Sequence, residues 1–112
     1  MRDKINDQAR LALMKEAISN IEAFIVGTDS CEAFITNKLL CHAVAYNLQC
    51  IGESSYKLSR EYVVSHKEID WDAMEGLRHV LVHDYYTVDM KTVWEILVKD
   101  LPVLKDYLNN HL

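Results

Sequence analysis

Residues 36–58 read T-N-K-L-L-C-H-A-V-A-Y-N-L-Q-C-I-G-E-S-S-Y-K-L, and they predict one long amphipathic helix. Apolar or small side chains recur along one face at steps of three and four residues, which is the spacing of an α-helix. They are Leu40, Val44, Leu48, Ile51, Ser55 and Leu58. Ala43, Ala45 and Gly52 keep parts of this helix thin. Because a thin helix lets a neighbour come close, we expect tight packing here against another helix of this chain or of a second copy.

The segment that precedes it, from about Asp3 to Val26, has the same periodicity. Its apolar stripe consists of Leu11, Met14, Ile18, Ile21 and Ile25. The sequence Gly27-Thr28-Asp29-Ser30 interrupts the pattern. We expect Gly27 to cap this helix, since glycine readily adopts the left-handed backbone found after helix ends.

Two shorter helical segments are predicted in the middle of the chain. Residues 60–66 have room for one or two helical turns. Asp70 is a candidate N-cap for a helix that continues to His83, because a carboxylate can accept the unpaired N–H groups of a first turn. The run D-Y-Y-T-V-D, residues 84–89, is expected to end it, since Tyr, Thr and Val form helices less readily and Asp favours caps.

A last long helix is predicted after Asp89, which is a candidate cap. Its apolar stripe consists of Val93, Leu97, Leu101, Leu104 and Leu108. Pro102 lies inside this helix and has no N–H to offer the carbonyl four residues earlier. We therefore expect a kink near Val98.

The composition supports an all-α chain. Half of the 112 residues are hydrophobic, and only three glycines and one proline are present. The scarcity of turn residues favours long helices. The length of the chain is that of one domain with one hydrophobic core. We predict a single domain over residues 1–112, built as an antiparallel up-and-down bundle of four to five helices.

Net charge and cysteine content limit which partners and which cellular compartment are expected. The net charge is −5, so a broad electrostatic surface for long nucleic acid is not expected, although a local phosphate site remains compatible. Cys41 and Cys50 face opposite sides of the predicted helix and cannot bridge each other within it. Free thiols, an N-terminus without an apolar signal core and the lack of a membrane-length apolar run predict a cytoplasmic protein that does not contact a membrane.

The chemically richest stretch is R-H-V-L-V-H-D-Y-Y, residues 78–86. Arg78 can hold a phosphate through two parallel hydrogen bonds and stays charged at any working pH. His83 can both accept and donate a proton near neutral pH. Together they form a minimal set of groups for chemistry at a phosphodiester. Tyr85 adds a phenolic hydroxyl that is available to bind a base or to be modified.

The positions of these residues on a helix limit how they cooperate. On a straight helix Arg78 and His83 point about 140° apart, so they do not share a face. A joint site needs either a break in the helix near His83 or contributions from two chains. Each residue also has an ordinary structural role as an alternative: Arg78 in an ion pair with Asp84, His83 as a cation at a helix end, and Tyr85 in packing under the last helix.

A metal site is a further alternative at the same helix. Glu75, His79 and His83 share one face, and two histidines four residues apart can chelate zinc. His42 or His66 would have to supply a third strong ligand, which the sequence does not fix. We therefore predict no metal and no other cofactor.

The order Arg, four residues, His, one residue, Tyr resembles the signature of the HEPN superfamily, and in particular of the HepT-like toxins. Arg78, His83 and Tyr85 occupy these positions, and His79 fits the polar position after the arginine. The Ile51-Gly52-Glu53 step, Trp71, the core L-R-x-x-L-V-H-x-Y and the late segment V-W-x-x-x-x-x-x-L-P-x-L follow the same pattern. The resemblance thus covers nearly the whole chain.

The resemblance implies a homodimer in which both copies of the motif face one cleft, and a metal-independent endoribonuclease activity on RNA. His83 would be the general acid or base and Arg78 would hold the scissile phosphate, so that the 2′-hydroxyl attacks and leaves a cyclic phosphate. His79, Glu53 and Asp84 would support these two residues.

The resemblance also implies a partner. HepT-like toxins are paired with a small nucleotidyltransferase antitoxin of the MNT type, which silences the toxin by AMP transfer to the motif tyrosine. That acceptor would be Tyr85, with the adjacent Tyr86 as an alternative. The added anion would block the phosphate site beside Arg78. A different class of function stays open: a non-catalytic helical module that binds a nucleotide or docks on the nucleotidyltransferase, or a structural dimer without activity.

Overall fold

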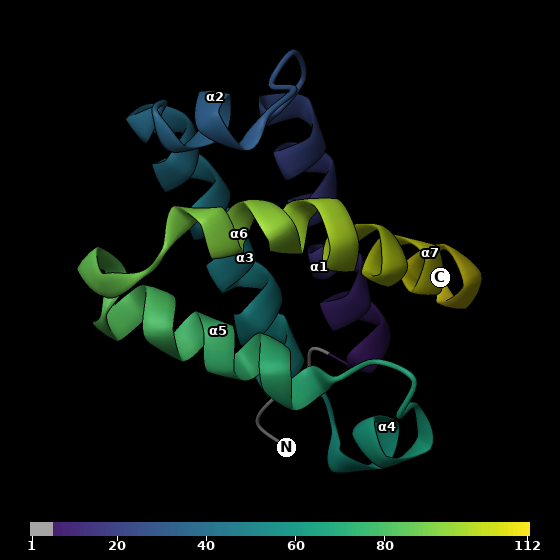
Figure 1. The fold of residues 1–112 in the computed structure, drawn as a ribbon. Helices are drawn as coiled ribbons and strands as arrows, with labels where there is room; N and C mark the ends of the chain where they lie inside the picture. Colours follow the sequence, from purple (N-terminus) through teal and green to yellow (C-terminus); the bar gives the residue numbers. More distant parts are fainter. Residues whose placement is uncertain (1–5) are drawn as a thin grey trace.

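The computed structural model describes residues 6–112, and the part of the chain it describes is all-α (Figure 1). The helices are α1 (Asp7–Phe24), α2 (Cys31–Ile35), α3 (Lys38–Tyr56), α4 (Arg60–Ser65), α5 (Trp71–His83), α6 (Met90–Glu95) and α7 (Leu101–His111). A 3₁₀ turn, η1 (Tyr85–Thr87), follows α5, and a π-helical segment, η2 (Ile96–Asp100), joins α6 to α7. The predicted fold class is confirmed.

Short polar side chains start most of these helices. Asn6, Ser30, Asn37 and Ser59 each accept a hydrogen bond from a backbone N–H in the first turn of the helix that follows. Asp70 and Asp89 do the same for α5 and α6, as predicted. These side chains satisfy donors that have no partner inside the helix, which explains why the helices start at these points.

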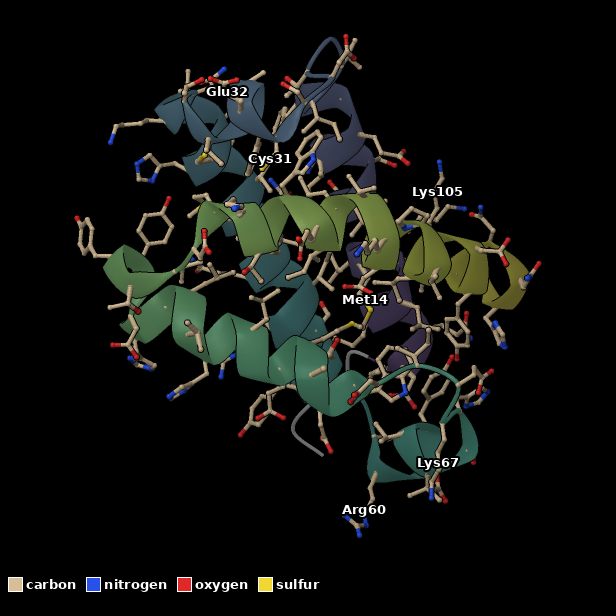
Figure 2. The ribbon with its side chains drawn as sticks, in the orientation of Figure 1. Met14, Cys31, Glu32, Arg60, Lys67 and Lys105 are labelled. Atoms are coloured by element: carbon tan, nitrogen blue, oxygen red, sulfur yellow. The ribbon has the colours of Figure 1, made fainter. Side chains whose placement is uncertain are left out.

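The predicted apolar stripes form one hydrophobic core. The stripe residues of α1, α3 and the C-terminal helix are buried, apart from the half-buried Ile25. Met14 on α1, labelled in Figure 2, is fully buried in the middle of the bundle. Phe34 on α2 is also fully buried and packs its ring 5.4 Å from that of Trp94, so α2 closes one end of the core.

Helix α3 is the centre of the arrangement. It packs along α1 on one side and along α5 on the other. In Figure 1 the rod formed by α6, η2 and α7 crosses in front of α1 and α3 and ends on the side of the molecule where α4 lies. The turn between α5 and α6 therefore lies at one side of the bundle in this view, and α4 with the end of α7 lies at the other.

Three local predictions need correction or refinement. Helix α2 was not expected, because its five residues are too few to show a periodicity. The C-cap of α1 is Ile25 instead of Gly27, although Gly27 does adopt a positive φ of 84° in the turn that follows. The expected start of the first helix at Asp3 lies outside the described residues.

Pro102 disturbs the last helix close to where the sequence predicts it. The disturbance takes the form of the π-helical segment η2, which ends two residues before Pro102. In a π-helix a carbonyl pairs with the N–H five residues later instead of four, so the carbonyl of Val98 does not need the N–H that Pro102 lacks. Among the described helices none is long and apolar enough to cross a membrane.

Candidate functional site

Helices α3 and α5 come close together at Gly52 of α3 and Arg78 of α5. A Cβ atom added to Gly52 on α3 would lie 2.4 Å from the Cβ of Arg78 and 2.7 Å from the carbonyl oxygen of Met74. Both distances are shorter than any side chain tolerates, so only glycine fits at this crossing. The sequence indicates that α3 has small side chains around Gly52, and Arg78 of the motif packs against the helix at this glycine.

Two residues of α3 contact the guanidinium of Arg78: Glu53, directly after Gly52, and Tyr56, one turn further along. Glu53 Oε1 lies 3.4 Å from Nη1, and the ring centre of Tyr56 lies 5.5 Å from Cζ. The arginine side chain is 23% exposed, which places the ion pair at the rim of the protein. Its guanidinium has five N–H donors, and one carboxylate oxygen cannot occupy them all, so donors remain for an anion. The predicted supporting role of Glu53 thus corresponds to a direct contact.

Arg78 opens onto a groove of about 500 Å³ between α1, α3 and α5. Its lining residues are Arg10, Leu13, Glu16, Ala17, Asn20, Tyr46, Asn47, Gln49, Cys50, Glu53, Ser54, Arg78 and Val82. Three of the apolar or aromatic ones, Leu13, Tyr46 and Val82, are exposed by 44%, 64% and 46%. The arginine therefore stands beside a groove with apolar side chains facing solvent.

His83 is the last residue of α5, and its side chain is exposed. Its nearest ring neighbour is His79, one turn back, with ring centres 4.6 Å apart. Helix α5 is regular up to His83 and ends there, so the helix does not break between Arg78 and His83. Arg78 and His83 are five residues apart on this regular helix, so their side chains leave it about 140° apart. The two residues therefore do not share one face of α5.

The chain turns directly after His83. The N–H of Asp84 donates to the carbonyl of Val80, and the carbonyl of Asp84 accepts from both the N–H and the hydroxyl of Thr87. Asp84 therefore shapes the turn through its backbone, while its side chain is exposed and forms no ion pair with Arg78.

Tyr85 turns inward and Tyr86 turns outward. Tyr85 is half-buried, and its ring stacks on His42 of α3 with centres 5.1 Å apart and planes inclined by 24°. Burial raises the pKa of the Tyr85 phenol, with smaller contributions from Cys41 and Tyr86, so the hydroxyl keeps its proton at neutral pH. Tyr86 is 97% exposed. The two neighbouring candidates for modification thus differ strongly in their surroundings.

Two neighbours of the motif were missed by the sequence interpretation. Tyr56 was not singled out, and His42 was considered only as a third metal ligand. Tyr56 lies three residues after Glu53, on the same side of α3, and that spacing is the one signal that could have pointed to it. For His42 no local signal exists, because its contact with Tyr85 joins two distant parts of the chain.

The metal alternative has no support from the arrangement of the described side chains. Across residues 6–112, no group of three or more histidine, cysteine, aspartate and glutamate side chains is arranged to hold an ion. His79 and His83 are close, but no third ligand of these types joins them. All three cysteines are free, with Cys41 buried and the other two half-buried.

Fold and site together define a class of all-α protein. In this class α3 packs against α5, α5 carries the motif arginine, and the motif histidine and tyrosine lie at and just after the end of α5. The sequence model of the ribonuclease HepT-like family matches residues 14–110. The chain therefore belongs to the HepT-like family of the HEPN superfamily.

Named relatives agree with this membership. A protein of Thermococcus cleftensis named "Probable ribonuclease HepT" is 36% identical over 91 residues, which are 80% of this chain and 81% of that protein. A "Putative RNase" of Methanocaldococcus jannaschii is 35% identical over 72 residues, 64% of this chain and 66% of its own length. Another of Caldanaerobacter subterraneus is 32% identical over 76 residues, 68% of each chain. No solved structure matches.

Proposed function

We propose that this protein is a metal-independent endoribonuclease and the toxin of a toxin–antitoxin pair. The proposal depends on one observation: the guanidinium of Arg78 lies at the rim of a groove, in contact with Glu53 and Tyr56. The exposed His83 is on the same helix. An arginine fixed on two sides is positioned to bind a phosphate before any reaction begins. The ribonuclease names carried by the relatives support the same activity.

The reaction is a transfer at phosphorus within the RNA. A histidine removes the proton of the 2′-hydroxyl, the 2′-oxygen forms a bond to the adjacent phosphorus, and the bond from phosphorus to the 5′-oxygen breaks. A second proton donor protonates the leaving 5′-oxygen. Arg78 neutralises the charge that builds up on the phosphate oxygens. The products are a cyclic phosphate end and a 5′-hydroxyl end.

A homodimer supplies the groups that one chain does not bring together. Arg78 and His83 lie about 140° apart around a regular α5, so a single substrate phosphate cannot meet both on one helix face. The exposed apolar side chains beside Arg78 give a second copy a surface to bury. In the dimer the arginine and the histidine of opposite chains face one phosphate.

Silencing by AMP transfer to Tyr85 completes the proposal, with a cognate nucleotidyltransferase of the MNT type as the antitoxin. The turn after α5 places this tyrosine two residues from His83. An added phosphate would compete with RNA for Arg78 and His83 by charge and by bulk. Three free thiols and an RNA substrate fit a cytoplasmic setting.

The test uses the purified chain, without a tag, and a single-stranded RNA labelled at one end. We expect cleavage in the presence of EDTA, with a cyclic phosphate on the upstream product. His83→Gln should abolish cleavage while circular dichroism shows an unchanged helical fold, because this side chain is exposed. His111→Gln, a half-buried histidine outside the motif, is the matched control and should cleave normally. Undiminished cleavage by His83→Gln would contradict the assignment.

A non-catalytic role is the second candidate, and the net charge of −5 favours it. In that case the same groove binds a nucleotide or docks on the nucleotidyltransferase. Arg78→Ala would then weaken nucleotide or partner binding, and the wild-type chain would cleave no RNA with or without divalent metal. The cleavage assay above therefore separates the two candidates.

A further inference from the structure

The groove beside Arg78 extends well beyond the arginine. Glu53, which pairs with Arg78, and Tyr46, which also lines the groove, lie seven residues apart on α3. Seven residues are two helical turns, or about 10 Å. This length is comparable to that of one nucleotide, so a phosphate bound at Arg78 would leave the adjoining nucleoside next to the rest of the groove.

The groove opens on a face of the bundle that the last helices leave uncovered. Its described lining residues come from α1, α3 and α5, and none of them belongs to the rod of α6, η2 and α7. That rod crosses α1 and α3 on the side that faces the viewer in Figure 1. In the proposed dimer both motifs face one cleft, and the groove then forms a wall of that cleft.

Tyr46 provides an aromatic ring two turns away from Glu53. The residue is 64% exposed and lines the groove. A hydrogen bond with the thiol of Cys50, one turn further along α3, raises the pKa of the Tyr46 hydroxyl. The phenol therefore keeps its proton at neutral pH and presents no charge that would repel RNA. Accessible aromatic rings stack on unpaired bases in proteins that bind single-stranded nucleic acid.

Polar side chains line the same groove. Ser54 and Asn47 of α3 are only 4% and 6% exposed. Asn47 donates one amide hydrogen to the carbonyl of Ala43 and accepts one from Asn20, so its amide keeps one N–H and one lone pair. Within the described part of the chain, the Ser54 hydroxyl and the Gln49 amide have no hydrogen-bond partner. The lining therefore offers both donors and acceptors to a ligand.

The charges of the lining are balanced. Arg10 and Arg78 stand against Glu16 and Glu53, so the groove does not share the excess of acids that gives the whole chain a net charge of −5. A flat, uncharged group with polar edges meets no electrostatic barrier in such a groove. The bases of RNA are groups of this kind, and the phosphate that accompanies each base can stay at Arg78.

We propose that this groove is a nucleobase subsite, in which Tyr46 stacks on the base of the nucleotide whose phosphate Arg78 holds. The amides of Asn47 and Gln49 meet the edge of that base, because amide groups can both donate and accept hydrogen bonds there. The substrate is then an unpaired stretch of RNA, since a base inside a duplex has no free face to stack on Tyr46. This inference rests on the proposed function for the phosphate at Arg78, and it adds the surface that receives the base.

The test measures how tightly the untagged chain binds fluorescein-labelled 2′-O-methyl RNA hexamers, which lack the attacking hydroxyl and stay intact. Tyr46→Ala should weaken binding roughly tenfold to a hundredfold, the usual effect of losing one base stack. Tyr46→Phe keeps the ring and should bind nearly as the wild type does. Phe24→Ala is the matched control, because it removes a ring that is 44% exposed at the end of α1, outside the groove.

An abasic hexamer of the same length separates stacking from a merely structural role. It offers the same phosphates without bases, so the wild type and Tyr46→Ala should bind it equally. An equal loss of affinity for both oligonucleotides would show that Tyr46 acts through the fold or the phosphate contact, and would overturn the proposal. A Tyr46→Ala chain that no longer dimerises while the wild type does would overturn it too, because Tyr46 would then belong to the dimer contact.

Failure of the subsite and failure of the proposed ribonuclease give different results. Hexamer binding that depends on Tyr46, in a wild-type chain that cleaves no RNA, supports the subsite without the reaction. RNA cleavage with a KM that Tyr46→Ala leaves unchanged refutes the subsite and leaves the ribonuclease intact.

Discussion

The carboxylate of Glu53 on α3 lies 3.4 Å from the guanidinium of Arg78 on α5, and Tyr56 lies against the same guanidinium. Glu53 also pairs with Lys57 through its other oxygen, at 3.2 Å. The motif arginine is therefore positioned by a different helix from the one that carries it. This relationship places Glu53 and Tyr56 among the residues that decide how Arg78 meets a ligand.

Replacing Glu53 tests this positioning. Glu53→Gln should lower kcat/KM for RNA cleavage by roughly tenfold to a hundredfold, because small displacements of a binding group cost about that much. Stability should change by no more than about 1 kcal/mol, since the pair is partly exposed and such pairs contribute little. Lys57→Gln removes the other partner of Glu53 and serves as the control. Equal activity of both variants would show that Glu53 does not position Arg78.

The helix crossing at Gly52 gives a stability prediction. Gly52→Ala should destabilise the fold by about 1–3 kcal/mol, because its Cβ would overlap the Cβ of Arg78 and the carbonyl of Met74. Gly76→Ala on α5 has nothing within 4 Å of the new Cβ and should stabilise by roughly 0.5–1 kcal/mol, the usual gain over glycine within a helix. Urea unfolding measures both, and the same sign for the two variants would refute the tight crossing.

The proposed composite site predicts complementation between inactive chains. Arg78→Ala and His83→Ala should each abolish RNA cleavage alone. Mixed and allowed to exchange subunits, they should regain part of the activity, because one heterodimer site then combines an intact arginine with an intact histidine from opposite chains. Cleavage is measured before and after exchange. Mixed dimers that form but stay inactive would indicate that both groups must come from the same chain.

The acceptor of AMP can be assigned by single substitutions. Tyr85→Phe should prevent the mass increase of AMP units on the chain when it is incubated with a nucleotidyltransferase and ATP, whereas Tyr86→Phe should not. Tyr86 is 97% exposed, so accessibility alone would favour it, and the comparison decides whether position relative to His83 matters more. Modification lost only in Tyr86→Phe would move the acceptor by one residue.

Tyr107 predicts how stability depends on alkaline pH. Burial first, and then the hydrogen bond with Tyr62, raise the pKa of Tyr107 above its ordinary value of about 10. The unfolded chain therefore loses this proton first and binds fewer protons than the folded chain above that pH. The contribution of Tyr107 to stability should therefore be constant below about pH 10 and be lost as the pH rises further.

Urea unfolding at several pH values measures this fall. Tyr107→Phe should lower stability near neutral pH by about 1 kcal/mol through the lost hydrogen bond, and should flatten the alkaline fall. Tyr86→Phe replaces an exposed ring and should leave the slope unchanged. An alkaline slope that is the same in all three proteins would count against the role given to Tyr107.

Local features of the sequence predicted most of the secondary structure. The capping roles of Asp70 and Asp89, the buried stripes and the end of α5 at His83 were all correct, because each depends on residues within a turn or two. Helix α2 and the C-cap at Ile25 were missed, since very short elements carry no periodic pattern. The π-helical form of the disturbance at Pro102 was also beyond a local prediction.

The sequence by itself determined that the chain is helical, which faces are buried, and which residues form the motif Arg78, His83 and Tyr85. Only the tertiary structure decided what these residues touch: Glu53 for the arginine, and His42 for the tyrosine. It also brought Tyr62 and Tyr107 together from positions 45 residues apart. The physical reason is that periodicity reveals the side of a helix that avoids water, while the identity of the surface it packs against depends on how all the helices fill one core.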